Sequence, residues 1–336
     1  MNSPDFPSNE YRFIEKLKKY CNYSPDNRYR IGVGDDAAVR ACEKDEQLIL
    51  TGDILIENVH FSTAYMSFEE VGFKALVASI SDCAAMGAIP DSALIQIGFP
   101  EGSKKIEEDF SMLYSGFNKA CKQWDLPIIG GDLSKAPCWI VAVSMTGRIR
   151  PQARVLMRTG AIISDNIWVS GVPGKSAAGL AVLKEWGRDN FPEEFSALVD
   201  AHIAPQARVS LGQKLAEDEH VHAVIDLSDG IAKECYTLCY ENRVGMALNP
   251  PKECMIPALV KLAGIQGKPR HEWFLYGGED YELLFTASSG FDPYRYEGVE
   301  LNKIGSVTDS PNTITINNPD GRNIDVMKKG WDHLQQ

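Results

Sequence analysis

The sequence lacks a long apolar run, a secretory leader and paired cysteine motifs. A membrane-spanning helix needs about 18 or more consecutive apolar residues, and no run in this chain approaches that length. The N-terminal residues have neither the basic nor the apolar segment of a secretory signal. The eight cysteines include no C-x-x-C motif, and without a leader they are expected to be reduced thiols that pack as small apolar residues. We therefore expect a cytoplasmic protein with no membrane partner.

Basic residues are scarce relative to acidic ones. The chain carries 34 Lys and Arg against 46 Asp and Glu, a formal net charge of −12. A nucleic-acid partner would require a basic face, so this balance argues against one. Phosphate-bearing small molecules stay compatible with the composition, because acidic sites can hold them through Mg²⁺.

Several catalytic signatures are absent as well. The chain has no G-x-S-x-G and no H-E-x-x-H. The segment 171–179 contains Gly-Lys-Ser before a predicted helix, but a P-loop requires glycine where Val169 stands. We expect a tight turn there with Ser176 as the helix N-cap, although its N–H groups could still contact an anion. His220 and His222 could form a metal pair, but two neighbouring surface histidines are the favoured interpretation.

The arrangement of strand-like and helix-like segments indicates the fold class. The 336 residues suggest about two domains. In the first half, strand patterns at 47–55, 92–99 and 138–147 alternate with helical patterns. Ser67 and Glu70 form a capping box that begins one of these helices. The order of elements predicts a mixed α/β layer domain.

A second helix and a domain boundary complete this prediction. Apolar residues from Ile106 to Ala120 are spaced 4, 3, 4 and 3 apart, as on one helical face. The basic, turn-rich segment 147–161 marks a boundary, and strand and helix patterns resume after it. We expect an α/β fold of the α+β type with two mixed domains, residues 1–148 and 149–336.

Aspartate recurs beside glycine at the ends of apolar runs. One such pair indicates only a turn, but six of them suggest a shared site. Carboxylates that converge on one pocket repel each other unless cations lie among them. Oxygen donors without His or Cys favour hard cations such as Mg²⁺, and several Mg²⁺ ions in a glycine-rich pocket indicate a phosphate substrate. The six segments are 32–39, 50–55, 79–88, 128–134, 224–230 and 276–283.

Taken together and in order, the motifs resemble those of the thiamine-monophosphate kinase family. This family belongs to the ATP-binding superfamily of aminoimidazole-ribonucleotide synthetase and selenophosphate synthetase. The resemblance runs from about residue 9 to residue 333. The motifs that carry it are GDDAAV, TGDILIENVHF, KALVASISDCAAMGA, IIGGD, RTGA, GVPGKSAAGL, IDLSDG, GGEDYEL and KGWDH.

The resemblance implies an architecture and an activity. The N-terminal domain would bind ATP and Mg²⁺ and would pair with its twin in a homodimer with a shared β-barrel. The C-terminal α/β domain would lie alongside. The implied reaction moves the γ-phosphoryl group of ATP, the co-substrate, onto thiamine monophosphate, with several Mg²⁺ ions as cofactors, and yields thiamine diphosphate.

The resemblance also implies roles for individual residues. It makes Asp53, Asp82 and Asp132 the catalytic carboxylates. Two of the implied contacts have structural alternatives. Tyr114 could instead occupy a position in the core, and Trp331 could instead pack the C-terminal tail. The implied Mg²⁺ ligands are Asp36, Thr51, Asp53, Asp82, Asp132, Asp226 and Asp229; the implied ATP contacts are Tyr114, Gly131, Asp132, Arg158 and Ser228; the implied substrate contacts are His60, Glu279 and Trp331.

Five residues depart from the family pattern, and two other functions stay open. The departures are Gly52, Asn58, Ser79, Leu133 and Lys175. One alternative is a divergent paralogue that phosphorylates another small phosphate or an amide-type acceptor. The other is a non-catalytic module that binds nucleotide or thiamine phosphate, which the retained aspartates disfavour.

Overall fold

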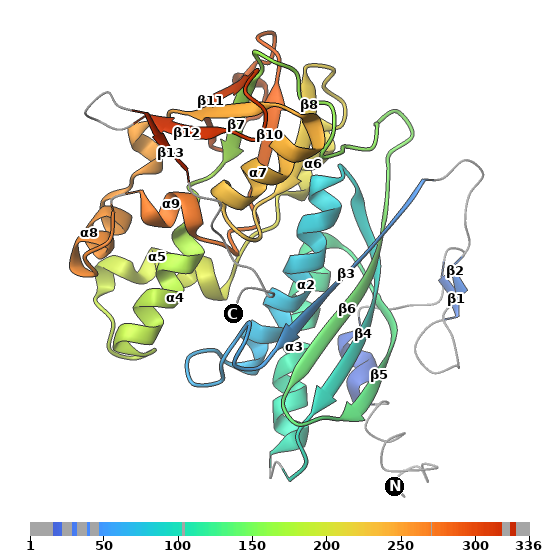
Figure 1. The fold of residues 1–336 in the computed structure, drawn as a ribbon. Coiled ribbons are helices and arrows are strands. Elements are labelled where there is room, and N and C mark those ends of the chain that lie inside the picture. The colour runs from blue at the N-terminus through green and yellow to red at the C-terminus, as the bar shows by residue number, and fades with distance from the viewer. Residues whose placement is uncertain are drawn as a thin grey trace, which may run out of the picture. The chain divides into compact units, whose positions relative to one another are not determined.

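The computed structural model describes residues 16–21, 29–31, 39–40, 47–102, 105–269, 271–317 and 323–326. The chain divides into two compact units (Figure 1). The first unit comprises residues 1–79 and 90–148, and the second comprises residues 80–89 and 149–336.

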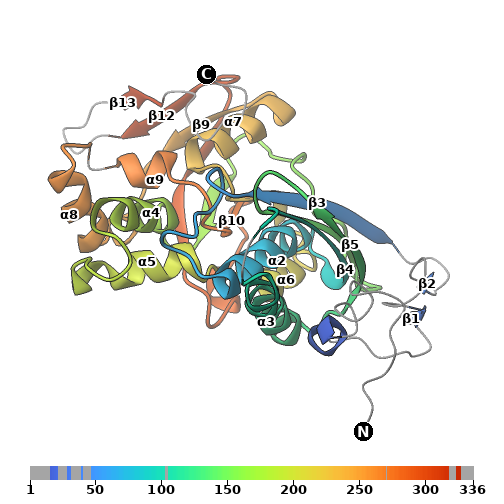
Figure 2. The ribbon, with the colours of Figure 1, turned by 90° about the horizontal axis from the view of Figure 1, so that it is seen from below.

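The first unit contains a four-stranded sheet with two helices on one face (Figures 1 and 2). The strand order is β3-β6-β4-β5; β3 is antiparallel to β6 and β4 is parallel to β5. A 3-10 turn (Lys18–Tyr20) and the short pair β1 (Tyr29–Ile31) and β2 (Val39–Arg40) precede the sheet. The main elements are β3 (Leu48–Ile56), α2 (Phe68–Ala85), β4 (Ile89–Phe99), α3 (Ile106–Trp124), β5 (Ile128–Lys135) and β6 (Ile140–Arg148).

Local signals fix both helices of this unit. The predicted capping box is confirmed: the Ser67 N–H donates to Glu70 Oε2 at 2.9 Å, and the Glu70 N–H donates to Ser67 Oγ at 3.3 Å. These bonds satisfy two N–H groups that a helix start otherwise leaves open. The predicted apolar face of α3 is also confirmed, because its side chains are buried except for Ile106, which is half-buried. They include Phe110, Leu113, Phe117 and Ala120.

Helices α2 and α3 approach each other so closely that glycine is required at the contact. A Cβ atom on Gly72 would lie 2.1 Å from the carbonyl oxygen of Leu113. On the other helix, a Cβ atom on Gly116 would lie 1.9 Å from the carbonyl oxygen of Glu69. Side chains at these two positions would force the helices apart and withdraw their apolar faces from the sheet.

The edge strand β3 exposes apolar side chains on the sheet face that the helices do not cover. Leu50 is 72% exposed, Ile54 is 49% exposed and Leu48 is 40% exposed. These residues alternate along the strand with less exposed ones, so they share one face. We call Leu48, Leu50 and Ile54 the β3 apolar face.

The second unit is built on a seven-stranded mixed sheet among the described residues, in the order β13-β12-β9-β11-β7-β10-β8. Helix α7 packs on this sheet, and Cys235 and Cys239 lie buried in that core, in agreement with the expectation that the cysteines pack as small apolar residues. The strands are β7 (Asn166–Ser170), β8 (Val221–Asp226), β9 (Gly245–Leu248), β10 (Leu283–Ala287), β11 (Leu301–Thr308), β12 (Ile314–Asn317) and β13 (Asn323–Asp325). The helices are α4 (Lys175–Trp186), α5 (Ser196–Ile203), α6 (Val209–Leu215), α7 (Ile231–Asn242), α8 (Pro257–Ile265) and α9 (Glu272–Tyr276), with 3-10 turns at Glu193–Phe195, Lys252–Cys254 and Pro293–Arg295.

Residues 80–89 belong with the second unit, although they precede the expected boundary at residue 148. A Cβ atom on Gly212 of α6 would lie 2.0 Å from the carbonyl oxygen of Ala84, so the two segments are in close contact. The Leu156 N–H donates to the carbonyl oxygen of Met86 at 3.1 Å. A boundary drawn along the sequence could not assign this segment, because its neighbours are distant in the chain.

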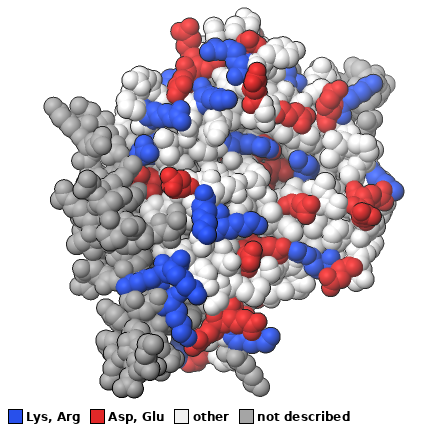
Figure 3. Space-filling view, turned by 180° about the vertical axis from the view of Figure 1, so that it is seen from behind, with Lys and Arg blue, Asp and Glu red and all other residues white. Residues whose placement is uncertain are grey.

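Three features of composition and surface follow from the same structure. The seven cysteines within the described part of the chain are free, and six of them are buried. No helix among the described residues has the length and apolarity that a bilayer crossing requires. On the face drawn in Figure 3, the described Lys and Arg side chains are interspersed with Asp and Glu, without a continuous basic area.

Candidate functional site

Strand β3 carries two of the implied metal ligands, Thr51 and Asp53, on its less exposed face. The Ser79 hydroxyl donates to Asp53 Oδ2 at 2.7 Å. Burial raises the pKa of Asp53, whereas the Ser79 hydrogen bond and the nearby His60 lower it. Asp53 is therefore a carboxylate held in one orientation, and Ser79, a departure from the family pattern, supplies a hydrogen bond that orients it.

The turn after β3 holds His60. The Ile56 N–H donates to His60 Nδ1 at 3.0 Å, so Nδ1 acts as an acceptor in this arrangement. Asn58 has a φ of 64°, and its N–H donates to the carbonyl oxygen of Phe61 at 2.7 Å. Asparagine adopts this left-handed conformation more readily than most residues. Asn58, one of the departures from the family pattern, is therefore compatible with the left-handed conformation of the turn.

Strand β5 carries Gly131 and Asp132 at the other edge of the sheet, where both residues are exposed. A Cβ atom on Gly131 would lie 1.9 Å from the carbonyl oxygen of Ile95, so only glycine fits there. Tyr114, in contrast, is buried in α3 and packs edge-to-face on Phe117 with ring centroids 5.2 Å apart. This environment favours the core interpretation of Tyr114 over a nucleotide contact.

In the second unit, the turn between β8 and α7 gathers several of the implied site residues. Strand β8 ends at Asp226, whose Oδ2 accepts a hydrogen bond of 2.7 Å from the Ser81 hydroxyl. Gly230, with a φ of 107°, is the N-cap of α7. Asp229 forms an ion pair with Lys233 one helical turn later, at 2.6 Å. Asp82 follows Ser81 on α2 and is partly buried.

Glu234 also belongs to this cluster, and the sequence analysis missed it. Its Oε1 accepts from the Asp229 N–H at 3.3 Å and from the Ser228 hydroxyl at 3.4 Å. Burial and the charge of Asp229 raise the pKa of Glu234 to about 7, while the charge of Arg158 lowers it. Arg158 and Ser228, both implied ATP contacts, therefore flank one buried carboxyl group. The available signal was an acidic residue in the first turn of a helix that follows Ser-Asp-Gly.

The GGEDYEL segment lies directly against this turn. The Glu279 N–H donates to the carbonyl oxygen of Ser228 at 2.7 Å, and the Tyr281 N–H donates to that of Leu227 at 2.9 Å. Glu279 and Tyr281 have φ values of 63° and 53°. Non-glycine residues adopt this conformation at a cost and mostly where surrounding structure enforces it, often at functional sites. The implied ATP contact Ser228 and the implied substrate contact Glu279 are thus neighbours.

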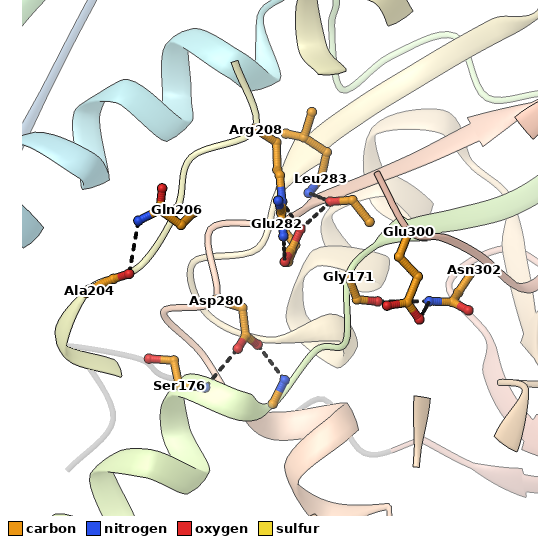
Figure 4. A network of polar contacts seen from close by, with 12 residues as sticks. Gly171, Ser176, Ala204, Gln206, Arg208, Asp280, Glu282, Leu283, Glu300 and Asn302 are labelled. Atoms are coloured by element: carbon orange, nitrogen blue, oxygen red, sulfur yellow. Dashed lines mark hydrogen bonds and ion pairs between the residues drawn. The ribbon is translucent and has the colours of Figure 1, made fainter. Parts of the chain in front are cut away.

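Asp280, between these two residues, caps helix α4 (Figure 4). Its carboxylate accepts from the Gly174 N–H at 2.5 Å and from the Ser176 N–H at 3.0 Å. Burial raises the pKa of Asp280 to about 7 despite these bonds. The prediction that Ser176 is the N-cap is wrong, because Gly174 is the N-cap with a φ of 89° and no capping side chain of its own. The anion at this helix start is the protein's own Asp280.

Glu282 continues the segment with a bidentate ion pair (Figure 4). Arg208 Nε lies 2.5 Å from Glu282 Oε2, and Arg208 Nη2 lies 2.5 Å from Oε1. The Ser170 hydroxyl also donates to Oε2. The hydrogen bonds to Glu282 raise the pKa of Arg208. Glu282 is buried, so this fork geometry compensates a charge that would otherwise be costly.

Each unit therefore carries some of the implied site residues. Asp36 and Trp331 lie outside the described residues. Among the described residues, no three His, Cys, Asp or Glu side chains are grouped as a metal site, and the full ligand set stays a prediction. His220 and His222 have separate partners, Ser288 at 2.9 Å and Asp165 at 2.8 Å, which argues against a metal pair.

Comparisons with known proteins agree with this geometry. The family model for AIR synthase related protein, N-terminal domain, matches residues 34–149. Thiamine-monophosphate kinase of Bacillus subtilis (strain 168) is 33% identical over 312 residues, which cover 91% of this chain and 94% of that protein. The crystal structure of thiamine-monophosphate kinase from Stenotrophomonas maltophilia K279a has a TM-score of 0.78 at 28% identity and covers 94% of this chain and 98% of that chain. AaThiL complexed with AMPPCP and TMP has a TM-score of 0.76 at 29% identity and covers 99% of this chain and all of that chain.

These similarities assign the protein to a class and to a family within it. The match over residues 34–149 puts this region in the AIR synthase-related class. At 33% identity over nine-tenths of its length, the chain belongs to the thiamine-monophosphate kinase family.

Proposed function

We propose that this protein transfers the γ-phosphoryl group of ATP to the phosphate of thiamine monophosphate, forming thiamine diphosphate and ADP. Family membership over nearly the whole chain supports this activity, as does the similarity to AaThiL complexed with AMPPCP and TMP. The observation that carries the proposal is the 2.7 Å hydrogen bond from the Glu279 N–H to the Ser228 carbonyl oxygen. It joins the segment expected to contact the acceptor to the segment expected to contact ATP.

The chemistry requires little proton transfer. The acceptor is a phosphate oxygen whose second pKa is about 6, so it is already anionic at pH 7 and needs no general base. This oxygen forms a bond to the γ-phosphorus, and the bond from that phosphorus to the β,γ-bridging oxygen breaks and leaves ADP. The principal barrier is repulsion between two polyanions, and Arg158 would reduce it by binding phosphate oxygens.

The donor set fits Mg²⁺ as the resident cation. Thr51, Asp53, Asp226 and Asp229 offer only oxygen atoms, which hard cations prefer. Two of these carboxylates, Asp53 and Asp226, are already oriented by serine hydroxyls at 2.7 Å. Mg²⁺ held by these donors would supply positive charge that offsets the repulsion between the phosphate groups. Asp36, Asp82 and Asp132 complete the proposed set.

We also propose that residues 1–148 bind ATP and Mg²⁺ and form a homodimer through the sheet. The β3 apolar face supports this pairing, because an exposed apolar edge strand invites association. A cytoplasmic location stays part of the proposal and rests on the free cysteines of the described chain.

The activity is tested by incubating the purified protein with ATP, Mg²⁺ and a panel of phosphorylated acceptors, and by quantifying product and ADP. Thiamine diphosphate and ADP should appear in equal amounts. Phosphorylation of a different acceptor, with none of thiamine monophosphate, would establish the divergent-paralogue alternative. Binding without ADP release for any acceptor would establish the non-catalytic alternative.

A further inference from the structure

A fully buried histidine lies behind Glu279 and has no role in the proposed chemistry. His202 is in the last turn of α5 and is 0% exposed. Its Nδ1 lies 3.2 Å from the Ser176 hydroxyl and 3.6 Å from Glu279 Oε2. Burial of an imidazole is costly unless its nitrogen atoms have polar neighbours. The placement of Nδ1 between a hydroxyl and a carboxylate satisfies that requirement on this side of the ring.

The backbone on both sides of Glu279 is fixed, but its side chain retains rotatable bonds. The Glu279 N–H is bonded to Ser228, and its φ of 63° is a conformation that the surrounding turn enforces. Asp280 is anchored to the start of α4 through Gly174 and Ser176. The Glu279 side chain is 27% exposed, and its carboxylate lies next to the buried His202, so the side chain is partly accessible from solvent while one of its neighbours belongs to the core.

We infer that His202 is a positioning residue that holds the Glu279 carboxylate in place to recognise the cationic, ring-bearing part of the acceptor. This inference rests on the proposed function, in which Glu279 contacts thiamine monophosphate. A fixed carboxylate attracts a cation without first losing side-chain freedom, whereas a mobile one must be ordered on binding. His202 therefore acts on acceptor affinity and not on ATP.

The Ser176 hydroxyl contributes to the orientation of the His202 ring. Ser176 is fully buried, and its backbone N–H is bound by Asp280, so its hydroxyl is held on the His202 side. The hydroxyl and the Glu279 carboxylate both face Nδ1, which fixes the ring between two partners. Ser176 and His202, both distant from Glu279 in the sequence, thus set the orientation of its partly exposed carboxylate.

The test measures the Kd for thiamine monophosphate by calorimetry without ATP, and separately the KM values for both substrates. His202→Leu should raise the acceptor Kd and KM at least tenfold and leave the KM for ATP within twofold. His202→Asn keeps a polar atom near the position of Nδ1 and should restore most of the affinity. In the Glu279→Gln background, His202→Leu should have no additional effect, because the partner through which it acts is already altered.

Several outcomes would overturn the inference. A folded His202→Leu protein with unchanged acceptor affinity would do so, as would fold-changes that multiply in the double variant. If circular dichroism shows that His202→Leu is unfolded, Ser176→Ala tests the inference in its place, since it removes only the hydroxyl beside His202 Nδ1. Acceptor binding should then weaken at least threefold, and unchanged binding refutes the positioning role.

The two measurements separate this inference from the proposed function. Coupled binding of thiamine monophosphate without turnover would refute the kinase activity and retain the role of His202. Turnover without coupling between His202 and Glu279 would support the kinase activity and refute the positioning role of His202. Absence of both binding and turnover would overturn both, because Glu279 would then not contact this acceptor.

Discussion

The Glu279 N–H donates to the carbonyl oxygen of Ser228, with 2.7 Å between nitrogen and oxygen. The residues are 51 positions apart, and the bond fixes the GGEDYEL segment against the turn that begins α7. A backbone bond of this kind does not depend on side-chain identity. The segments expected to contact the two substrates therefore share one rigid element, and a displacement of one is transmitted to the other.

The first prediction concerns the carboxylate on β3. Asp53→Asn should reduce phosphoryl transfer below detection and leave the fold intact, because it removes charge where Mg²⁺ is expected. Ser79→Ala removes only the 2.7 Å hydrogen bond and should raise the Mg²⁺ concentration for half-maximal rate about 10-fold. Rates across a Mg²⁺ titration, with calorimetric metal binding, provide the measurement.

Ser92→Ala is the matched control for this series. Ser92 is also a buried serine of the first unit, but its hydroxyl pairs with Thr146 at 2.9 Å. Its Mg²⁺ requirement should equal that of the unmodified protein. Normal transfer by Asp53→Asn would remove Asp53 from the proposed ligand set.

The second prediction concerns the pH dependence of stability. Burial raises the pKa of Asp280 from 3.8 to about 7 in the folded protein, so the folded state binds this proton more tightly than the unfolded state does. The stabilisation is complete below about pH 4 and is lost as the pH rises to 7. The change is on the order of a few kcal/mol. Urea unfolding between pH 4.5 and 8 should show this decline.

Asp280→Asn tests whether Asp280 causes this decline. The quantity compared is the change in the free energy of unfolding with pH, and not its absolute value. The amide does not titrate, so the free energy of unfolding should vary less across the same pH range. Lys175 and Glu282, which also act on Asp280, are retained in the variant. An unaltered pH profile would show that another group causes the decline.

A third prediction distinguishes steric fit from backbone conformation. Gly174 has a φ of 89°, and a Cβ atom there would lie 2.3 Å from the carbonyl oxygen of Trp273. Gly267 has a φ of 62°, with no atom within 4 Å of its Cβ position.

Gly267→Ala should therefore lower the free energy of unfolding only by the roughly 1–2 kcal/mol that a left-handed alanine costs. Gly174→Ala should cost more than 3 kcal/mol, measured by thermal or urea unfolding; equal costs would contradict the steric account.

The fourth prediction concerns association through the β3 apolar face. Sedimentation at micromolar concentration should give about twice the chain mass of 37.1 kDa. Leu50→Lys should yield monomers, because it places a charge on a side chain that is 72% exposed in the single chain. Met112→Lys, at an exposed apolar position on α3, should remain dimeric. A monomeric unmodified protein would refute the pairing.

Features that depend on neighbours in sequence were predictable. The Ser67–Glu70 capping box and the buried face of α3 follow from spacings of three and four residues. The strand predicted over 47–55 is likewise marked by a local apolar run, and β3 occupies Leu48–Ile56. In each of these cases the interacting groups are separated by about one turn or one pleat, so the pattern in the sequence is also the pattern in space.

Features that depend on distant contacts were not predictable. Asp280 and Ser176 are 104 positions apart, and Arg208 and Glu282 are 74 apart. No periodicity relates such residues, so Ser176 was given a capping role that belongs to Asp280. The resemblance placed Glu279 in the site but gave no indication of His202, which becomes relevant only when α5 packs beside α4.

The carboxylate of Asp280 at the start of α4 has a consequence for how this protein responds to its solution. A helix start that is exposed to solvent attracts whichever phosphate or sulfate is abundant, so its geometry varies with the medium. Here the position is filled by a carboxyl group of the protein itself, which cannot diffuse away. The turn at Gly174 is thereby insulated from the salts around it, and at a given pH the segment that carries Glu279 keeps the same anchor whichever anions the buffer contains.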